Sequence, residues 1–292
     1  MNPSPSHSTD PVPDQTPGPI PEAPLSRIPN LGHALIFISF AGLLLLLSQL
    51  ALILTGHSPA SLQKGVVTLQ HPKAQLAAMA ATYLATLAAA WLFFPALWHR
   101  RFLDGISWHW ETARRQAPRL IALGLCLGGS VQIVTYFIPT PKTLPIDDFF
   151  NTQLNAWLIT LFGTVMAPVF EEICFRGFLV PAFAIAYDWL RLPRTPEAHQ
   201  RWRTTTALTP AAFLFSAILS SVFFALLHAE QLANLRPALL VLFSVSLVLT
   251  YVRIKTDSVA CSALVHSAYN SFVFLTVLIA TGGYRHLDRL TK

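Results

Sequence analysis

Seven long runs of this sequence contain no Asp, Glu, Lys or Arg, and this feature limits the chain to a membrane fold. The runs are 34–55, 74–98, 120–140, 151–170, 204–229, 237–252 and 258–284. A helix needs about 20 apolar residues to cross about 30 Å of hydrocarbon. Only 12% of the residues are charged, about half the share of a typical soluble domain, which excludes an ordinary water-soluble enzyme. We therefore predict an all-α fold, a polytopic transmembrane helical bundle with about seven to eight spans.

Two segments need separate comment. The run 237–252 has only 16 residues and is the marginal span. The apolar segment 177–187 is too short to span alone, and we expect it to continue the helix that begins near Asn151. Within that long helix, Pro168 and Pro181 predict kinks.

The N-terminal 30 residues differ from the rest of the chain, because they hold nine of its 22 prolines. Such a composition buries too little apolar area to offset the cost of ordering. We expect a disordered tail over 1–30, without the features of a signal peptide, and a transmembrane domain over 31–292.

The positive charges lie between the apolar runs. The net charge is +6, but Lys and Arg form no interleaved basic and aromatic surface, so we expect no nucleic-acid partner. Loop counts of Lys and Arg favour an N-terminus inside, in a prokaryotic cell membrane. On this topology twelve lie inside, against seven outside and Arg176 within the membrane. The twelve are Arg27, Arg100, Arg101, Arg114, Arg115, Arg119, Arg191, Arg194, Arg201, Arg203, Arg253 and Lys255.

Three ionisable groups, Glu171, Glu172 and Arg176, interrupt the apolar sequence of the fourth run and its continuation. Charges at membrane depth cost several kcal/mol each and are rare there unless they are paired or functional. At about 100° per residue, Arg176 lies about 40° from Glu172 and about 140° from Glu171 around a helix. Glu172 and Arg176 are thus expected to neutralise each other, which leaves Glu171 on another face. The alternative is that both acids are structural partners of Arg176.

Two further apolar runs carry histidine. Phe224 and His228 share one helix face, as do His266 and Asn270, because each pair has an i, i+4 spacing. Taken alone, His228 is interpreted as a histidine at the membrane interface. The alternative interpretation of His266 and Asn270 is that they form hydrogen bonds between helices. Glu171 and His228 can meet only if the fourth helix continues past Glu171 and the segment after His228 lines a cavity.

Together these runs supply one unpaired carboxylate, two imidazoles and an amide, a set that suits hydrolysis of an amide bond. A carboxylate can take a proton from water, and histidine with asparagine can donate hydrogen bonds to an oxyanion. The sequence has no HExxH, GxGD or GxSG motif of other proteolytic chemistries.

The same residues resemble those of a known family, the CAAX prenyl endopeptidase type II, Abi and bacteriocin-processing (CPBP) intramembrane proteases. The family patterns EExxxR, FxxxH and HxxxN match in order Glu171, Glu172 and Arg176, then Phe224 and His228, then His266 and Asn270. The resemblance covers about 150–280, the expected protease core. It implies that Glu171 is the base, that His228 helps to hold water, and that His266 and Asn270 form the oxyanion side. Glu172, Arg176 and Phe224 would support the site.

The resemblance also implies a substrate, a membrane-associated peptide or protein within the lipid bilayer. Eukaryotic relatives imply prenylated CAAX substrates, and the prokaryotic branch includes members linked to bacteriocin maturation or self-immunity. If a divalent metal such as zinc takes part, Glu171, His228 and His266 are its predicted ligands. Two rival functions stay open: a non-catalytic immunity or scaffold protein, and a proton-coupled transporter.

Overall fold

Seven helices in the described part of the chain are long and apolar enough to cross a membrane. The computed structural model describes residues 27–57, 61–63, 66–68, 71–139 and 145–290, so most of the predicted tail lies outside the described residues. The seven are α1 (Leu31–Leu54), α2 (Pro72–Trp98), α4 (Trp110–Tyr136), a continuous helix Gln153–Arg191, α9 (Pro210–Leu227), α10 (Arg236–Thr256) and α11 (Val259–Ala280). Each predicted run falls on one of them, which confirms the predicted bundle.

The marginal run 237–252 lies within α10, which has 21 residues because it also includes Arg236, Arg253 and Lys255 at its ends. At about 1.5 Å per residue, α10 is about 31 Å long. It is therefore long enough to span a bilayer.

The helix Gln153–Arg191 carries the acid pair at its centre, as its predicted continuation requires. It consists of α5 (Gln153–Leu161), a π-helical segment Phe162–Met166, α6 (Ala167–Glu172), a π-helical segment Ile173–Leu179, and α7 (Val180–Arg191). Pro168 and Pro181 each follow a π-helical segment by two residues. Proline lacks an N–H and collides with the carbonyl four residues earlier, and a wider π turn relieves this conflict. The kinks at these prolines stay a prediction.

Shorter elements connect the spans. They are α3 (Phe102–Gly105), α8 (Pro196–Thr204) and the 3₁₀ turns Pro145–Phe150 and Leu287–Leu290. Between α1 and α2, β1 (Ser61–Gln63) pairs antiparallel with β2 (Val66–Thr68). This two-stranded hairpin departs from an entirely helical chain, and its second strand contains the strand-favouring sequence Val-Val-Thr.

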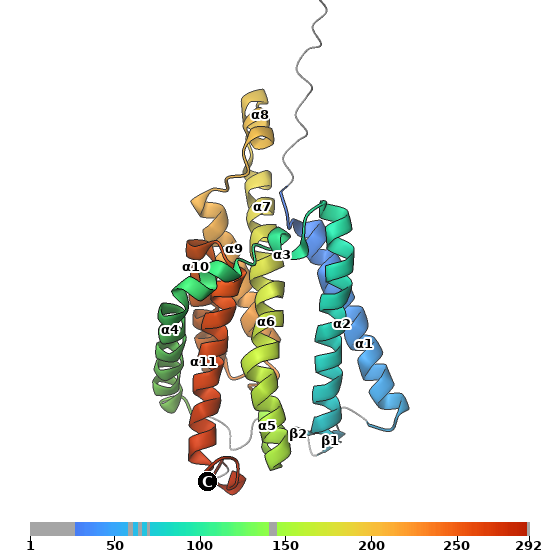
Figure 1. The fold of residues 1–292 in the computed structure, drawn as a ribbon, viewed down its shortest axis with the longest axis vertical. Coiled ribbons are helices and arrows are strands. Elements are labelled where there is room, and N and C mark those ends of the chain that lie inside the picture. The colour runs from blue at the N-terminus through green and yellow to red at the C-terminus, as the bar shows by residue number, and fades with distance from the viewer. Residues whose placement is uncertain (1–26, 58–60, 64–65, 69–70, 140–144, 291–292) are drawn as a thin grey trace, which may run out of the picture.

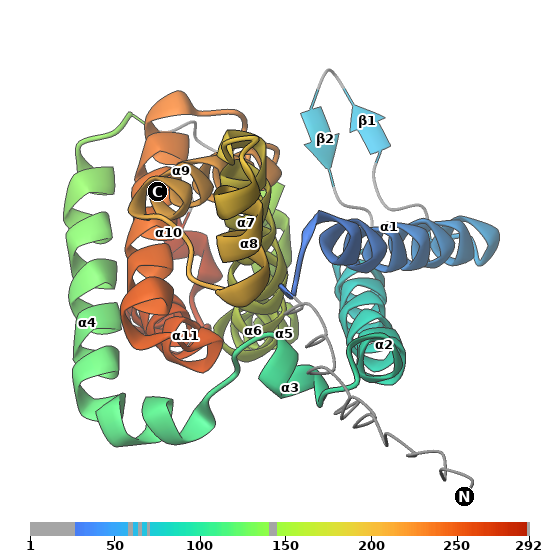
Figure 2. The same cartoon turned by 90° about the horizontal axis from the view of Figure 1, so that it is seen from above.

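The long helix separates two groups of spans. In Figure 1, α1 and α2 lie on one side of α5, α6 and α7, and α4 and α11 lie on the other. Seen from above in Figure 2, α4 lies at the edge farthest from α1 and α2. The long helix contacts α1, α2, α9 and α11 directly, so its centre is enclosed by other spans.

Aromatic side chains fix the long helix against α1 and α2. Tyr83 of α2 stacks on Phe170, with ring centroids 3.8 Å apart and planes within 6°. Phe37 of α1 stacks on Phe178 at 4.5 Å and also contacts Phe170 at 5.9 Å. Because Phe170 directly precedes Glu171, this packing sets the rotation of the helix that presents the acid pair.

Two glycines allow α4 to approach α11 closely. A Cβ on Gly124 would lie 2.5 Å from the Val265 carbonyl oxygen, and one on Gly128 would lie 2.8 Å from Phe272. Small residues spaced four apart commonly let membrane helices pack backbone to backbone. This contact supports the helix that carries His266 and Asn270.

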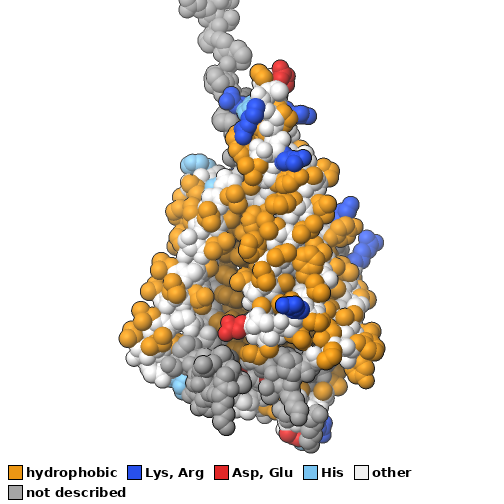
Figure 3. Space-filling model, turned by 180° about the vertical axis from the view of Figure 1, so that it is seen from behind, with side chains coloured by type: hydrophobic (Ala, Val, Ile, Leu, Met, Phe, Trp, Pro, Cys, Tyr) orange, Lys and Arg blue, Asp and Glu red, His pale blue; other side chains and the backbone are white. Residues whose placement is uncertain are grey.

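Hydrophobic side chains cover most of the flank in Figure 3, and most Lys and Arg residues belong to the connections and helix ends. The twelve Lys and Arg residues predicted to lie inside belong to one end of the bundle. It is the end at which α1 begins and α2 ends. Of the remaining described cations, Lys73, Arg236, Arg285 and Arg289 belong to the opposite end. The chain is an integral membrane protein by its spans, with an asymmetry of charge between its two ends.

Candidate active site

The two adjacent acids at the end of α6 differ sharply in their surroundings. The Glu172 side chain has no exposed surface, whereas 16% of the Glu171 side chain is exposed. Neighbouring residues on a helix point about 100° apart, so one acid faces the packed interior and the other faces a partly open space. Of the two carboxylates, Glu171 is the one that a small molecule can reach.

Glu172 forms the ion pair with Arg176 that the sequence predicts. Arg176 Nη1 donates to Glu172 Oε1 at 2.8 Å, and neither side chain is exposed. Two residues of α10 that sequence reasoning missed complete the environment of this guanidinium. Arg176 Nη2 donates to the Ser246 carbonyl at 2.8 Å and to the Ser246 hydroxyl at 2.7 Å, and Nε donates to the Thr250 hydroxyl at 3.3 Å. These bonds join α10 to the acid pair.

His266 of α11 lies between the two acids. Its Nδ1 is 3.0 Å from Glu172 Oε1, and its Nε2 is 3.9 Å from Glu171 Oε2. The ionised Glu172 only accepts hydrogen bonds, so His266 Nδ1 carries a proton. Glu172 thus orients the imidazole and turns its Nε2 toward Glu171.

His228 approaches Glu171 from another helix. It follows the last residue of α9, and its Nε2 is also 3.9 Å from Glu171 Oε2. Its Nδ1 is 2.8 Å from the Phe224 carbonyl oxygen, which only accepts, so Nδ1 again carries the proton. In the neutral form of this tautomer, Nε2 carries no proton and faces Glu171.

The Phe224 ring packs among the site residues. Its centroid is 4.6 Å from that of His228 and 5.9 Å from that of His266. The Arg176 guanidinium lies 5.1 Å from the same ring. Phe224 therefore holds both imidazoles by ring contact and orients His228 through its carbonyl.

Asn270, one turn beyond His266, bonds to the π-helical segment of the long helix. Its Nδ2 donates to the Gly163 carbonyl at 2.6 Å. In an α-helix the Ala167 N–H would donate to this carbonyl, but here it donates to Phe162, and the following Pro168 has no N–H. The amide satisfies a carbonyl that the π turn and proline leave without a helical donor, and its second N–H stays available.

Six of the predicted site residues, all except Asn270, gather at the meeting point of four spans. Glu171, Glu172 and Arg176 come from the long helix, Phe224 and His228 from α9, and His266 and Asn270 from α11, while α10 supplies Ser246 and Thr250. The Asn270 side chain lies one helical turn beyond His266 and bonds to Gly163, eight residues before Glu171. The predicted continuation of the fourth helix past Glu171 is what brings the acid to the depth of His228.

The three predicted metal ligands, Glu171 Oε2 and the Nε2 atoms of His228 and His266, do not fit a metal ion as they stand. Ligand atoms of a tetrahedral zinc site with bonds of about 2.1 Å lie about 3.4 Å apart. Here Glu171 Oε2 is 3.9 Å from each imidazole Nε2. Among the described residues, no group of three or more His, Cys, Asp or Glu is arranged to hold a metal. A separation of 3.9 Å between Glu171 Oε2 and His228 Nε2 does suit a bridging water molecule.

Comparison with protein families gives a match that covers the part of the chain that builds this site. The family model is described as type II CAAX prenyl endopeptidase Rce1-like, and it matches residues 153–272. The comparisons with curated proteins and with solved structures gave no match. The matched residues begin at the start of the long helix and contain every residue of the three motifs. Residues 153–272, or 120 of the 292 residues, are therefore similar to the Rce1-like family of type II CAAX prenyl endopeptidases.

Proposed function

We propose that this protein is an intramembrane endopeptidase that hydrolyses a peptide bond with water activated by Glu171. The observation that carries the proposal is the convergence of two imidazole Nε2 atoms on Glu171 Oε2, each at 3.9 Å. These residues lie in the segment that matches a family of CAAX prenyl endopeptidases. Glu171 is the exposed member of the acid pair, and Glu172 is already neutralised by Arg176. This division of roles leaves Glu171 as the free base.

In the first step, a water molecule lies between Glu171 and the unprotonated Nε2 of His228. Glu171 takes one proton from the water, and the water oxygen bonds to the carbonyl carbon of the substrate. Proton transfer by a positioned carboxylate is worth roughly 10² to 10⁴ in rate. Because Nδ1 of His228 is held by the Phe224 carbonyl, the histidine accepts the second water hydrogen and fixes the direction of attack.

The carbonyl oxygen gains negative charge in this step, and His266 with Asn270 would stabilise it. Each donor in such an oxyanion site is worth roughly 10² to 10³ in rate. His266 Nδ1 is engaged with Glu172, so donation from Nε2 requires the doubly protonated imidazolium. Asn270 keeps one N–H for the oxyanion while the other bonds to Gly163.

In the second step, the tetrahedral intermediate collapses and the carbon–nitrogen bond breaks. Glu171 returns its proton to the departing amine, so the carboxylate is regenerated. The products are a new carboxyl terminus and a new amino terminus. The chemistry needs only the protein groups and one water. The alternative is a metal-dependent hydrolysis in which Glu171, His228 and His266 are the ligands, and the chelator experiment tests it.

The substrate class that follows is a peptide or protein segment that reaches the site within the membrane. The family name supports a carboxyl-terminal CAAX sequence that carries a prenyl group. We place the Lys- and Arg-rich end of the bundle, where α1 begins, on the cytoplasmic side by the positive-inside rule.

The test is cleavage by the purified full chain in detergent, with a fluorogenic prenylated CAAX peptide and a panel of membrane peptides. Wild type, Glu171→Ala and His228→Ala are compared, together with wild type in a strong chelator. We expect both variants to lose cleavage while remaining folded, and we expect the chelator to have no effect. The exposed acid Glu230 provides a matched control, because Glu230→Ala also removes one carboxylate, two residues from His228 in the sequence.

Three outcomes would oppose the proposal in distinct ways. An active Glu171→Ala protein would remove Glu171 from the mechanism. Loss of wild-type activity in chelator would replace the metal-free mechanism with a metal-dependent one. Absence of cleavage on every peptide, with a folded protein, would favour the immunity or scaffold function.

A further inference from the structure

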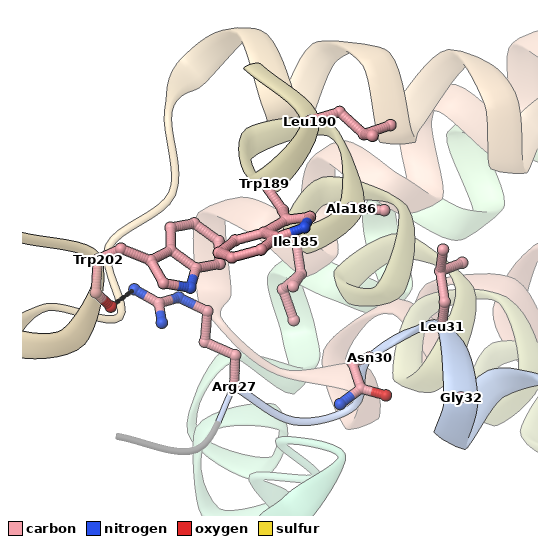
Figure 4. A pocket seen from close by; sticks show the side chains of 9 residues that line it. All are labelled: Arg27, Asn30, Leu31, Gly32, Ile185, Ala186, Trp189, Leu190 and Trp202. Atoms are coloured by element: carbon pink, nitrogen blue, oxygen red, sulfur yellow. Dashed lines mark hydrogen bonds between the residues drawn. The ribbon is translucent and has the colours of Figure 1, made fainter. Parts of the chain in front are cut away.

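A second site lies at the Lys- and Arg-rich end of the bundle, away from the acid pair. It is a hollow of about 450 Å³ between the start of α1 and the ends of α7 and α8 (Figure 4). Trp189 lines it and follows Glu171 by 18 residues on one continuous helix, which corresponds to about 27 Å. The hollow is therefore separate from the candidate active site.

The polar side of the hollow carries Arg27, and a second arginine, Arg194, lies beside Trp189, which is one of the lining residues. The Arg27 guanidinium lies 3.6 Å from the Trp202 ring centroid, and its Nη2 donates to the carbonyls of Trp202, at 2.6 Å, and Thr205. Figure 4 shows this guanidinium at the edge of the hollow, beside the Trp202 ring. Arg194 lies 5.9 Å from the ring of Trp189. The rings and carbonyls hold these cations in place without neutralising them.

Carboxylates do not cancel this positive charge. Within the described residues, no Asp or Glu oxygen lies within 4.0 Å of Arg27 or Arg194. Asp188 attracts Arg27 at longer range, but its two oxygens accept hydrogen bonds from the N–H and hydroxyl of Thr209, at 2.7 and 2.6 Å. The segment 188–205 and Arg27 together contain five arginines and two acids, a net charge of +3.

The other side of the hollow is apolar. Leu31, Ile185, Ala186 and Leu190 line it. Leu31 is 42% exposed and Leu190 is 75% exposed, so this surface continues onto the flank of the bundle, where the acyl chains of a bilayer lie. Arg27 lies four residues before the first residue of α1, a candidate span, so we place it at the depth of the lipid headgroups.

We propose that this hollow binds an anionic phospholipid. The phosphate lies against Arg27 and Arg194, and one acyl chain follows Leu31, Ile185 and Leu190 toward the membrane core. An anionic lipid suits the site better than a zwitterionic one. A zwitterionic headgroup carries a cationic group, which the net positive charge of the site would repel. Tryptophan at the membrane interface, with apolar rings and a polar edge, is a typical border for such a site.

The experiment uses the full chain in detergent and counts bound lipid by native mass spectrometry. The protein is titrated with dioleoyl phosphatidylglycerol or with dioleoyl phosphatidylcholine, which have the same acyl chains, and with glycerol phosphate alone. We expect saturable binding of one phosphatidylglycerol at this site, in preference to phosphatidylcholine. The double variant Arg27→Gln/Arg194→Gln should weaken binding by about 25-fold, at about fivefold for each basic residue.

The matched control is Arg115→Gln/Arg119→Gln, which removes the same charge from exposed positions at the same end of the bundle. It should change the affinity by less than twofold. Since Arg27 also bonds to backbone, Arg194→Gln alone and Ala186→Trp serve as variants that keep those bonds. Ala186→Trp should abolish binding by filling the hollow without changing charge.

The proposal is overturned by equal binding of both lipids, or by equal losses in the two double variants, which would mean general attraction to charge. It is also overturned if Ala186→Trp binds lipid as wild type does. Saturable binding of glycerol phosphate at the same affinity would assign the site to a soluble phosphate instead of a lipid.

Discussion

Replacement of Arg176 by methionine should destabilise this protein severely, because it strands the Glu172 carboxylate in the packed interior. Neither side chain of the pair is exposed, and the two are 2.8 Å apart. Breaking a buried ion pair by removing one partner costs about 3–5 kcal/mol. At roughly 2 °C per kcal/mol for a chain of this size, the melting temperature should fall by roughly 6–10 °C. Thermal and denaturant unfolding in mixed micelles, followed by tryptophan fluorescence, measures both quantities.

Two comparisons separate the buried charge from other effects of the substitution. The variant Glu172→Gln/Arg176→Met has no stranded charge and should recover at least half of the lost stability, since a buried pair replaced by neutral groups costs little. Arg114 pairs with Glu111 at 3.3 Å on the surface, and Arg114→Met should cost less than about 1 kcal/mol. The reasoning is refuted if Arg176→Met costs no more than Arg114→Met, or if the double variant is no more stable than Arg176→Met alone.

Three further substitutions test the contacts around the site. Ser246→Ala should lower the unfolding free energy by about 1.5–3 kcal/mol, because it removes a bond to the buried guanidinium. Ser244→Ala, at an exposed position on the same helix, should leave the unfolding free energy unchanged in the same assay. Gly124→Ala should lower the unfolding free energy by about 1–3 kcal/mol, because its Cβ would lie 2.5 Å from the backbone of α11. At Gly129 the nearest contact to a Cβ would be 3.6 Å, so an equal loss of stability in Gly129→Ala would contradict the packing argument. Asn270→Ala should cost about 1–3 kcal/mol by leaving the carbonyl of the π turn unpaired, and equal melting temperatures would remove this role.

The number and positions of the spans could be predicted from the sequence, because apolar runs of sufficient length without charges leave few other folds. The pairing of Glu172 with Arg176 followed from helical spacing alone, since residues four apart share a helix face. That the fourth helix continues beyond Glu171 also followed from its apolar sequence. These features depend on the spacing of nearby residues or on the length of apolar runs, and both can be read from one sequence.

Contacts between distant helices could not be predicted in the same way. Ser246 and Thr250 hold the Arg176 guanidinium, but small hydroxyl residues are common in apolar helices and most of them bond to their own helix, as Ser244 does. The partner of Asn270 depends on the π turn near Gly163, which arises from packing against α11 as well as from Pro168. The available clue was Pro168, because a proline inside a helix leaves a carbonyl of the preceding turn without a donor.

The hydrolytic role of Glu171 is tested most directly by the source of oxygen in the product. Wild type and Glu171→Gln, a substitution of nearly the same shape, are incubated with a prenylated CAAX peptide in water enriched in ¹⁸O, and the products are weighed by mass spectrometry. We predict that wild type releases a fragment with one ¹⁸O atom in its new carboxyl group, and that folded Glu171→Gln releases none above background. Labelled product formed by Glu171→Gln at the wild-type rate would contradict the mechanism.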